Sequence, residues 1–176
     1  ADLTITREVL EVLQKYHESI ADAGVMPSPV CLTVEQHERL FILNYPGGSR
    51  LNRTIGMIVT AMLTAKSGYK IGFQFDPYRI ILDVPARTTV KDLLAILKGF
   101  VPEVGSLLRF AIKDSPSLKP QLLHSARKMG AIAPDADIGK FGMKKLMEAY
   151  SDTPLYTEAV ERFLFHQLDQ DGMEEF

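Results

Sequence analysis

Hydrophobic residues recur at two different spacings along this chain, and the spacing changes near residue 88. Before that point, apolar and polar residues alternate in short runs such as "LFILNY", "KIGFQFD" and "RIILDV". Alternation with a period of two residues is typical of strands that bury one face of a sheet. After that point, apolar residues recur every three or four positions, which is the period of an amphipathic helix. The pattern therefore predicts a part that contains strands, followed by a part made of helices.

Residues 1–87 are expected to form an α+β subdomain. Apolar spacing predicts an amphipathic helix over residues 4–23 and a largely buried helix over residues 51–66. Residues 30–45 predict two strands joined by the polar turn "EQHE", and residues 70–85 predict two more joined by "PY". Strands that arrive in hairpin pairs favour a small, mostly antiparallel four-stranded sheet with packed helices.

Residues 88–176 are expected to form an all-helical subdomain. A threonine can cap its first helix, Asp152 or Thr153 can cap its last, and Pro120 suits the first turn of a middle one. On the last helix Phe163 and His166 fall on one apolar face, so we expect His166 to be packed. The boundary near residues 85–89 is too short for a flexible linker, so the two subdomains are expected to form one unit. The predicted helices cover residues 88–100, 102–115, 117–132, 139–150 and 152–170.

Composition limits the classes of function. The chain has 176 residues, 46% of them hydrophobic, which suits one globular domain or a domain with a small helical appendage. The formal net charge is −2, so any nucleic-acid surface must be a local patch. The single cysteine, Cys31, excludes an internal disulfide and gives no zinc-ligand spacing, so we expect a reducing, cytoplasmic setting. The longest apolar run, residues 55–65, is too short to span a bilayer, and we expect no membrane partner.

The stretch "NYPGGSRLNRTIG", residues 44–56, is the first candidate site. Two glycines and basic side chains precede an apolar helix, but the lysine and the glycine spacing of a nucleotide-binding P-loop are absent. What remains is a helix N-terminus with free N–H groups beside Arg50, Asn52 and Arg53, which are candidates for binding a phosphate. The alternative is that the glycines form a turn, Ser49 caps the helix, and the arginines are solvated or paired with acids.

A second concentration of basic residues lies in "LLRFAIKDSPSLKPQLLHSARK". The stretch carries Arg109, Lys113, Lys119, His124, Arg127 and Lys128 against one acid, Asp114, and it could face a phosphate backbone. Of these, Lys119, His124, Arg127 and Lys128 are the candidates for the contact. The alternative is a solvated helical surface without a ligand.

No constellation typical of catalysis or of a metal site is present. Cys31 lies in the apolar run "PVCLTV", where a small buried hydrophobe is the more common role. The four histidines are scattered and show no spacing typical of metal ligands. We therefore expect no catalytic residues, no metal and no cofactor in this chain.

Four stretches, in order, resemble the large helicase-related proteins, the Lhr-type branch of superfamily 2 helicases. "GGSRLNRTIGMIVTAML" resembles that family's G-[TS]-R-x-N-R-[TA]-[LI] segment, and "FQFDPYRIILDVP" resembles its D-x-Y-x-I-x-[LF] strand pair. "SPSLKPQLLHSARKMGAI" is similar to S-x-L-F-[RK]-x-[RK]-F-x-H-x-A-R, and "DTPLYTEAVERFL" is similar to TP-x-Y-x-EA. The chain departs from the third pattern at residues 119–121, "KPQ", where an aromatic that could stack on a base is lost.

The resemblance implies a C-terminal accessory domain, called DEAD/H-associated, that follows two RecA-like motor domains and a winged helix. It implies an α+β body, similar to bacterial secretion chaperones, that helps the motor engage single-stranded DNA or RNA. It also implies that ATP and Mg²⁺ bind to the motor domains of a parent protein that acts in DNA repair. The residues of the glycine loop would touch phosphates or hold the domain against the motor, and those of the second stretch would line a basic face.

A second hypothesis, from another class, is a protein-interaction or dimerisation module without a nucleic-acid role. A stand-alone enzyme is disfavoured because the catalytic constellation is missing. The chain begins at Ala1 without methionine and ends after an amphipathic run, so we expect a piece of a larger helicase. N-terminal processing or a cloning boundary would also explain these ends.

Overall fold

The computed structural model describes residues 11, 24–99, 104–113, 115, 117–136 and 143–176. Apart from Glu11, the helix expected over residues 4–23 lies outside the described residues, as do residues 137–139 of the loop expected after the third helix of the second half. In the part that the structure describes, four strands and seven helices form an α+β fold, with the helices mainly in the second half. The predicted fold class is confirmed.

The four strands form one antiparallel sheet in the order β1-β2-β4-β3. The two hairpins therefore join through β2 and β4, which are the inner strands. This arrangement confirms the expected pairing of strands in hairpins. The strands are β1 (Thr33–His37), β2 (Leu40–Asn44), β3 (Gly72–Phe75) and β4 (Arg79–Asp83).

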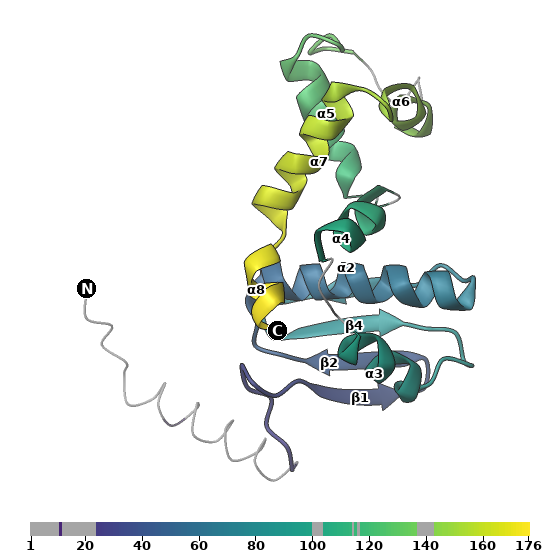
Figure 1. Ribbon diagram of the computed structural model, residues 1–176, viewed down its shortest axis with the longest axis vertical. Coiled ribbons are helices and arrows are strands. Elements are labelled where there is room, and N and C mark those ends of the chain that lie inside the picture. Colours follow the sequence, from purple (N-terminus) through teal and green to yellow (C-terminus); the bar gives the residue numbers. More distant parts are fainter. Residues whose placement is uncertain (1–10, 12–23, 100–103, 114, 116, 137–142) are drawn as a thin grey trace.

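Alternation along the inner strands directs one set of side chains onto a helix. Phe41 and Leu43 of β2, and Ile80 and Leu82 of β4, are fully buried. Helix α2 (Gly48–Ser67) lies across this face of the sheet (Figure 1). Because the other residues of these strands are half-buried or exposed, the main core lies between the sheet and α2.

The turn of the first hairpin differs from the expectation. It lies at Glu38 and Arg39 rather than over "EQHE", and β1 continues through His37. Glu38 has φ of +50°, in the left-handed region that allows the tight reversal. Glu35 and His37 belong to β1 but are exposed to solvent. Because exposed strand residues can be polar, this part of the strand has the composition of a turn.

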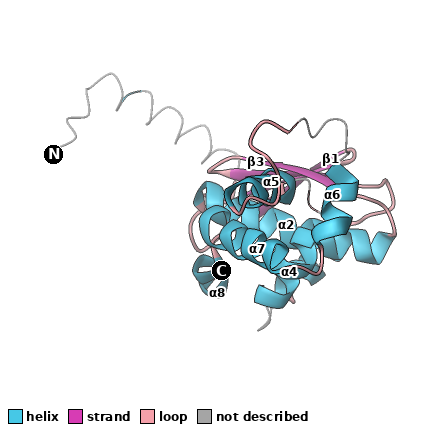
Figure 2. Cartoon of the chain, turned by 90° about the horizontal axis from the view of Figure 1, so that it is seen from above, coloured by secondary structure: helices cyan, strands magenta, loops and turns pink. Residues whose placement is uncertain are grey.

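Helices α4, α5, α6 and α7 rise from α2 on the side away from the sheet, whereas α3 does not (Figure 1). Helix α4 packs on α2, α5 packs along α7, and the short α8 returns to α2 (Figures 1 and 2). Helix α8 was not expected, and it ends the chain beside the start of α2. The division into subdomains at residues 87 and 88 stays a prediction. The helices are α3 (Val90–Lys98), α4 (Val104–Lys113), α5 (Leu118–Lys128), α6 (Met143–Tyr150), α7 (Pro154–Gln167) and α8 (Gln170–Glu175).

The expectation that His166 is packed is wrong. Its ring is exposed and meets Phe165 edge to face, with 5.0 Å between the ring centroids. Val160 and Leu164 are buried on α7 together with Phe163, so the buried face is centred away from His166. No described helix of the chain is long and apolar enough to cross a membrane.

Helix α2 approaches the sheet closely at Gly56. A Cβ at this position would stand 2.5 Å from two carbons of the Phe73 ring and 3.2 Å from Cγ2 of Ile80. Gly56→Ala should therefore lower the free energy of unfolding by about 1–2 kcal/mol, because the strain of overpacking exceeds the gain in helix propensity. Urea unfolding measures this change.

Gly105→Ala on α4 is the matched control. A Cβ there would meet only Oε1 of Gln170, at 3.9 Å. This variant should be as stable as the unchanged chain or more stable by up to about 1 kcal/mol. Equal destabilisation by the two substitutions would contradict the close approach at Gly56.

Helix α3 begins with a capping box. The Thr89 hydroxyl accepts from the Asp92 N–H, and the Asp92 carboxylate accepts from the Thr89 N–H, while Lys66 of α2 lies 2.6 Å from Asp92 Oδ1. The hydrogen bond from Lys66, followed by those from Thr89, holds the pKa of Asp92 well below its ordinary value. The ionised carboxylate therefore ties the start of α3 to the end of α2.

The depressed pKa predicts how Asp92→Asn changes stability with pH. A lowered pKa in the folded state stabilises the protein above the unfolded pKa of about 4, and this stabilisation is lost as the pH falls further. Asp92→Asn should thus be less stable than the unchanged chain at neutral pH, and the difference should shrink below about pH 4. Thermal unfolding at several pH values tests this, and a difference that is constant or grows in acid would contradict it.

Candidate nucleic-acid interface

The glycine loop between β2 and α2 is a turn covered by the second hairpin. Gly48 has φ of +78°, which favours glycine, and its N–H donates to the Pro77 carbonyl at 3.0 Å. Gly47 is the N-cap of α2, and no side chain caps the helix, so the expected capping by Ser49 is wrong. The turn is as expected, but at least one of the N–H groups that would bind a phosphate is already used.

Asn52 joins the two loops at this end of the sheet. Its side chain is fully buried, and Nδ2 donates to the carbonyls of Tyr45 and Asp76, each at 2.9 Å. Its Oδ1 is buried without a hydrogen-bond partner in the structure. An amide in this position fixes the entry of the chain into α2 relative to the second hairpin.

Arg50 binds the C-terminal end of α7. One guanidinium nitrogen, Nη2, donates to the Phe165 carbonyl at 3.0 Å and to the Leu168 carbonyl. The last carbonyls of a helix have no partner within the helix, and they carry the negative end of its dipole. A cation at this position therefore satisfies carbonyls that would otherwise need water.

Arg53 lies one turn further along α2 and contacts the same segment. Its guanidinium carbon lies 4.9 Å from the centroid of the Phe163 ring and 5.8 Å from that of Phe75, and Nη1 donates to Oε1 of Gln167. Burial lowers the pKa of Arg53 from its ordinary value, although the group stays protonated at neutral pH. The side chain thus links the edge of the sheet to α7.

Thr54 completes this contact between α2 and the C-terminal helices. Its hydroxyl accepts from the Asp169 N–H at 2.9 Å and donates to the Arg50 carbonyl at 2.8 Å. We call the set of Arg50, Arg53 and Thr54 the α2 clamp. The clamp holds the chain at residues 163–169, where α7 ends and α8 begins.

The structure therefore places the first group of candidate residues in contacts within the chain. Arg50 and Arg53 contact α7 near its C-terminal end, and Asn52 is buried. Contact of these residues with phosphates stays a prediction. Arg50 and Arg53 would contact a phosphate through the guanidinium N–H groups that the clamp does not use. Asn52 could reach a phosphate only if the loops that cover it opened.

The second group of candidates lies on α5. His124, Arg127 and Lys128 are exposed, and Lys119 is half-buried. At 3.6 residues per turn, His124, Arg127 and Lys128 fall on the half of α5 opposite its buried residues, and Lys119 lies at the border of the buried half. Arg127 Nη2 makes a long contact of 3.4 Å to the Ala136 carbonyl, and none of the four has an ion-pair partner among the described residues. The structure brings these four together on one helix, and it does not bring them near the clamp.

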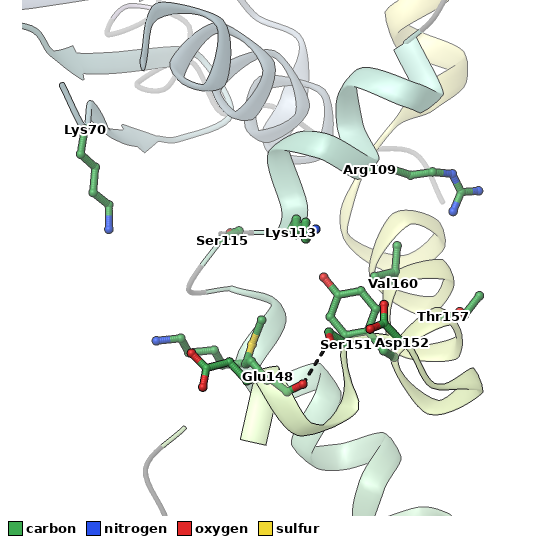
Figure 3. Close-up of a pocket in the computed structure, with 12 residues that line it drawn as sticks. Lys70, Arg109, Lys113, Ser115, Glu148, Ser151, Asp152, Thr157 and Val160 are labelled. Atoms are coloured by element: carbon green, nitrogen blue, oxygen red, sulfur yellow. Dashed lines mark hydrogen bonds between the residues drawn. The ribbon is translucent and has the colours of Figure 1, made fainter. Parts of the chain in front are cut away.

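Lys119 also lines a recess between the two halves of the chain. Figure 3 shows this recess, with most of its lining residues labelled. The recess has a volume of about 950 Å³. Cationic side chains line it from three places: the loop between α2 and β3, helix α4 and helix α5. Acidic and polar side chains from α6 and α7 line its other part. The charged residues that line it are Lys70, Arg109, Lys113, Lys119, Glu148 and Asp152.

Sequence reasoning missed Lys70 as a candidate. It follows the end of α2 in the stretch "SGYK", where only the break of the helix is visible in the sequence. Lys70 is about forty residues before Arg109 and Lys113 in the sequence, but the fold brings it into the same recess. Charge concentration along the chain could not have found it, because its neighbours in space are distant in sequence.

Metal binding has no support in the residues that the structure describes. No group of three or more histidine, cysteine, aspartate or glutamate side chains there could hold an ion. Cys31 is half-buried and free.

Comparison with known families identifies the chain. A family model described as DEAD/H associated matches residues 26–176. The chain belongs to the DEAD/H associated family. This membership confirms the resemblance to the accessory domain of Lhr-type helicases.

The fold of this DEAD/H associated domain is shared with part of a solved helicase. That structure is of Mycobacterium smegmatis helicase Lhr bound to ssDNA and AMP-PNP, with a TM-score of 0.67 and 18% sequence identity. The match covers 95% of this chain and 23% of the Lhr chain, so the domain spans about a quarter of the protein that it resembles. A search of curated proteins gives no match.

The α2 clamp predicts that Arg50 stabilises the DEAD/H associated domain without any ligand. Arg50→Ala should lower the free energy of unfolding by about 1 kcal/mol. This is less than a buried hydrogen bond to a charged group contributes, because the Arg50 side chain is exposed and water screens its charge. Urea unfolding in the absence of nucleic acid measures it. Arg87→Ala, which removes an exposed arginine that stacks on Tyr69, should change stability by less than about 0.5 kcal/mol. Unchanged stability in Arg50→Ala would contradict the clamp.

Proposed function

We propose that this chain is the accessory domain of an Lhr-type ATP-dependent DNA helicase and helps the motor engage single-stranded nucleic acid. Family membership and the shared fold support the helicase context. The Lhr helicase of the structural match was solved with ssDNA bound, which supports a single strand as the ligand. In this proposal ATP and Mg²⁺ belong to RecA-like motor domains of a parent chain, and those domains and a winged helix are the protein partners. The setting is cytoplasmic.

The exposed face of α5 carries this proposal. His124, Arg127 and Lys128 present cationic or titratable side chains on the exposed half of the helix, and Lys119 lies at its border; none of the four has an ion-pair partner among the described residues. Unpaired cations on one face of a nearly neutral chain form the local patch that phosphate contact requires. Pairing with acids would instead have left the face neutral.

The salt dependence of binding tests the role of α5. The chain should bind a fluorescent oligothymidylate with an affinity that falls as sodium chloride rises, because each phosphate contact releases a counterion. Arg127→Gln with Lys128→Gln should weaken binding and make the slope of log affinity against log salt shallower by about 1.4, since each single-strand contact contributes about 0.7. Fluorescence anisotropy over a salt series measures both.

Lys91→Gln with Lys98→Gln is the matched control. Both lysines are exposed on α3, away from α5 and from the recess beside it. The control should bind as the unchanged chain does. If the α5 variant and the control have the same affinity and slope, the assignment of α5 to the nucleic-acid surface is wrong.

A second candidate function is a protein-interaction or dimerisation module. Large apolar side chains that are mostly exposed, such as Phe165 at 75% and Tyr78 at 70%, favour it. Light scattering of the chain with and without the oligonucleotide separates the two functions. A stable dimer that is indifferent to the oligonucleotide would favour the interaction module.

A further inference from the structure

Two recesses of different chemistry meet along α4. The first is the recess of about 950 Å³ already described, with Lys70, Lys113 and Lys119 in its lining. The second, of about 590 Å³, lies between α2, α4 and the edge strand β3, and is lined mainly by small or apolar residues. Lys70 and Ser115 line both recesses, so the two adjoin there, and we call the pair of recesses the groove.

Helix α4 is the ridge between the recesses. Arg109 and Lys113 lie four residues apart on one face and line the first recess. Phe110 is turned by about 60° from Lys113 around the helix and lines the second. One helix therefore presents cations to one side and an aromatic ring to the other.

The lysines of the groove are available for an anion. Lys70 and Lys113 are exposed, and neither they nor Lys119 have an ion-pair partner in the described part of the chain. Arg109 is already paired with Glu161 of α7. The acids of the first recess, Glu148 and Asp152, come from α6 and from the connection to α7, whereas Lys70 and Lys113 come from the sheet side and from α4 (Figure 3).

The second recess provides an apolar surface beside these cations. Phe110 is 65% exposed, and it lines this recess together with small residues of α2 such as Ala61 and Ala65. Phe73 of β3 lines the same recess. An exposed ring next to unpaired lysines fits a ligand that is anionic along its backbone and flat and apolar at its side groups.

We propose that this groove is the path of the single strand across the domain, with phosphates against Lys70, Lys113 and Lys119 and a base stacked on Phe110. The inference rests on the proposed function and adds Lys70, Lys113 and Phe110 to it. Phe110 would supply the aromatic that the segment at residues 119–121 lacks. An acidic peptide would satisfy the lysines but would not need the ring.

The test compares two groove variants in the oligothymidylate anisotropy assay with the 176-residue chain. Phe110→Ala should weaken binding about fivefold or more without changing the salt slope, because stacking releases no counterion. Lys70→Gln with Lys113→Gln should weaken binding and make the slope shallower by about 1.4. Circular dichroism checks that both variants are folded, which their exposed positions favour.

Matched controls isolate the groove from exposure and charge in general. Phe165→Ala removes another exposed ring, and Lys91→Gln with Lys98→Gln removes two exposed lysines of α3. Both controls should bind as the unchanged chain does. Phe110→Tyr should restore the affinity that Phe110→Ala loses, because tyrosine keeps the stacking face.

The outcomes separate the groove from the function on which it rests. If the chain binds the oligonucleotide and the α5 variant weakens it, but both groove variants bind normally, the groove is wrong and the proposed function stands. If polyglutamate competes as well as the oligonucleotide and Phe110→Ala has no effect, the groove is a site for acidic polypeptide and the base assignment is overturned. If the chain binds no single strand at low salt, both the proposed function and the groove are wrong.

Discussion

The position of the helical half depends on the contact between the start of α2 and the junction of α7 and α8. Arg50 donates to carbonyls at the end of α7, Arg53 lies over the Phe163 ring, and the Thr54 hydroxyl accepts from the Asp169 N–H. These polar contacts are directional, so they fix the register of the C-terminal helices on α2, whereas the apolar packing around them could tolerate some sliding. Because α5 packs along α7, the clamp also determines where the α5 cations and the groove lie relative to the sheet.

Basic side chains have two different roles in this arrangement, which the sequence alone does not distinguish: some bind within the domain, and others are free to bind a ligand. The arginines that follow the glycine pair are engaged within the domain, where carbonyls and aromatic rings satisfy them. The lysines of the α5 face and the groove have no ion-pair partner among the described residues, and Arg127 has only its long contact to the Ala136 carbonyl there. A cation that is already satisfied gains little from a phosphate, whereas a solvated one gains the release of counterions. The proposed interface accordingly lies away from the glycine loop.

Much of the fold could be predicted because local patterns agree with the final structure. The period of two residues in β2 and β4 follows from burial on α2, and a threonine, Thr89, caps α3 as expected. Of the two candidates Asp152 and Thr153, it is Thr153 that caps α7. The features that the sequence did not predict have a common cause, because each is determined by contacts between residues that are distant in the sequence. Helix α8 has six residues and depends on packing against α2, the Ser49 cap is not used, and Lys70 reaches the groove only through the fold. The α5 candidates were visible as a charge concentration, but Phe110 gave no signal because it lies in an ordinary helical repeat.

The central claim is that the α2 clamp makes the sheet and the helical half one cooperative unit. Native-state hydrogen exchange in low concentrations of urea tests it most directly, because it measures an opening free energy for each segment. The account predicts that amides in the first turns of α2 and in the last turn of α7 share one opening free energy and respond equally to urea. Opening of α7 at a clearly lower free energy, with α2 and the sheet still protected, would contradict it.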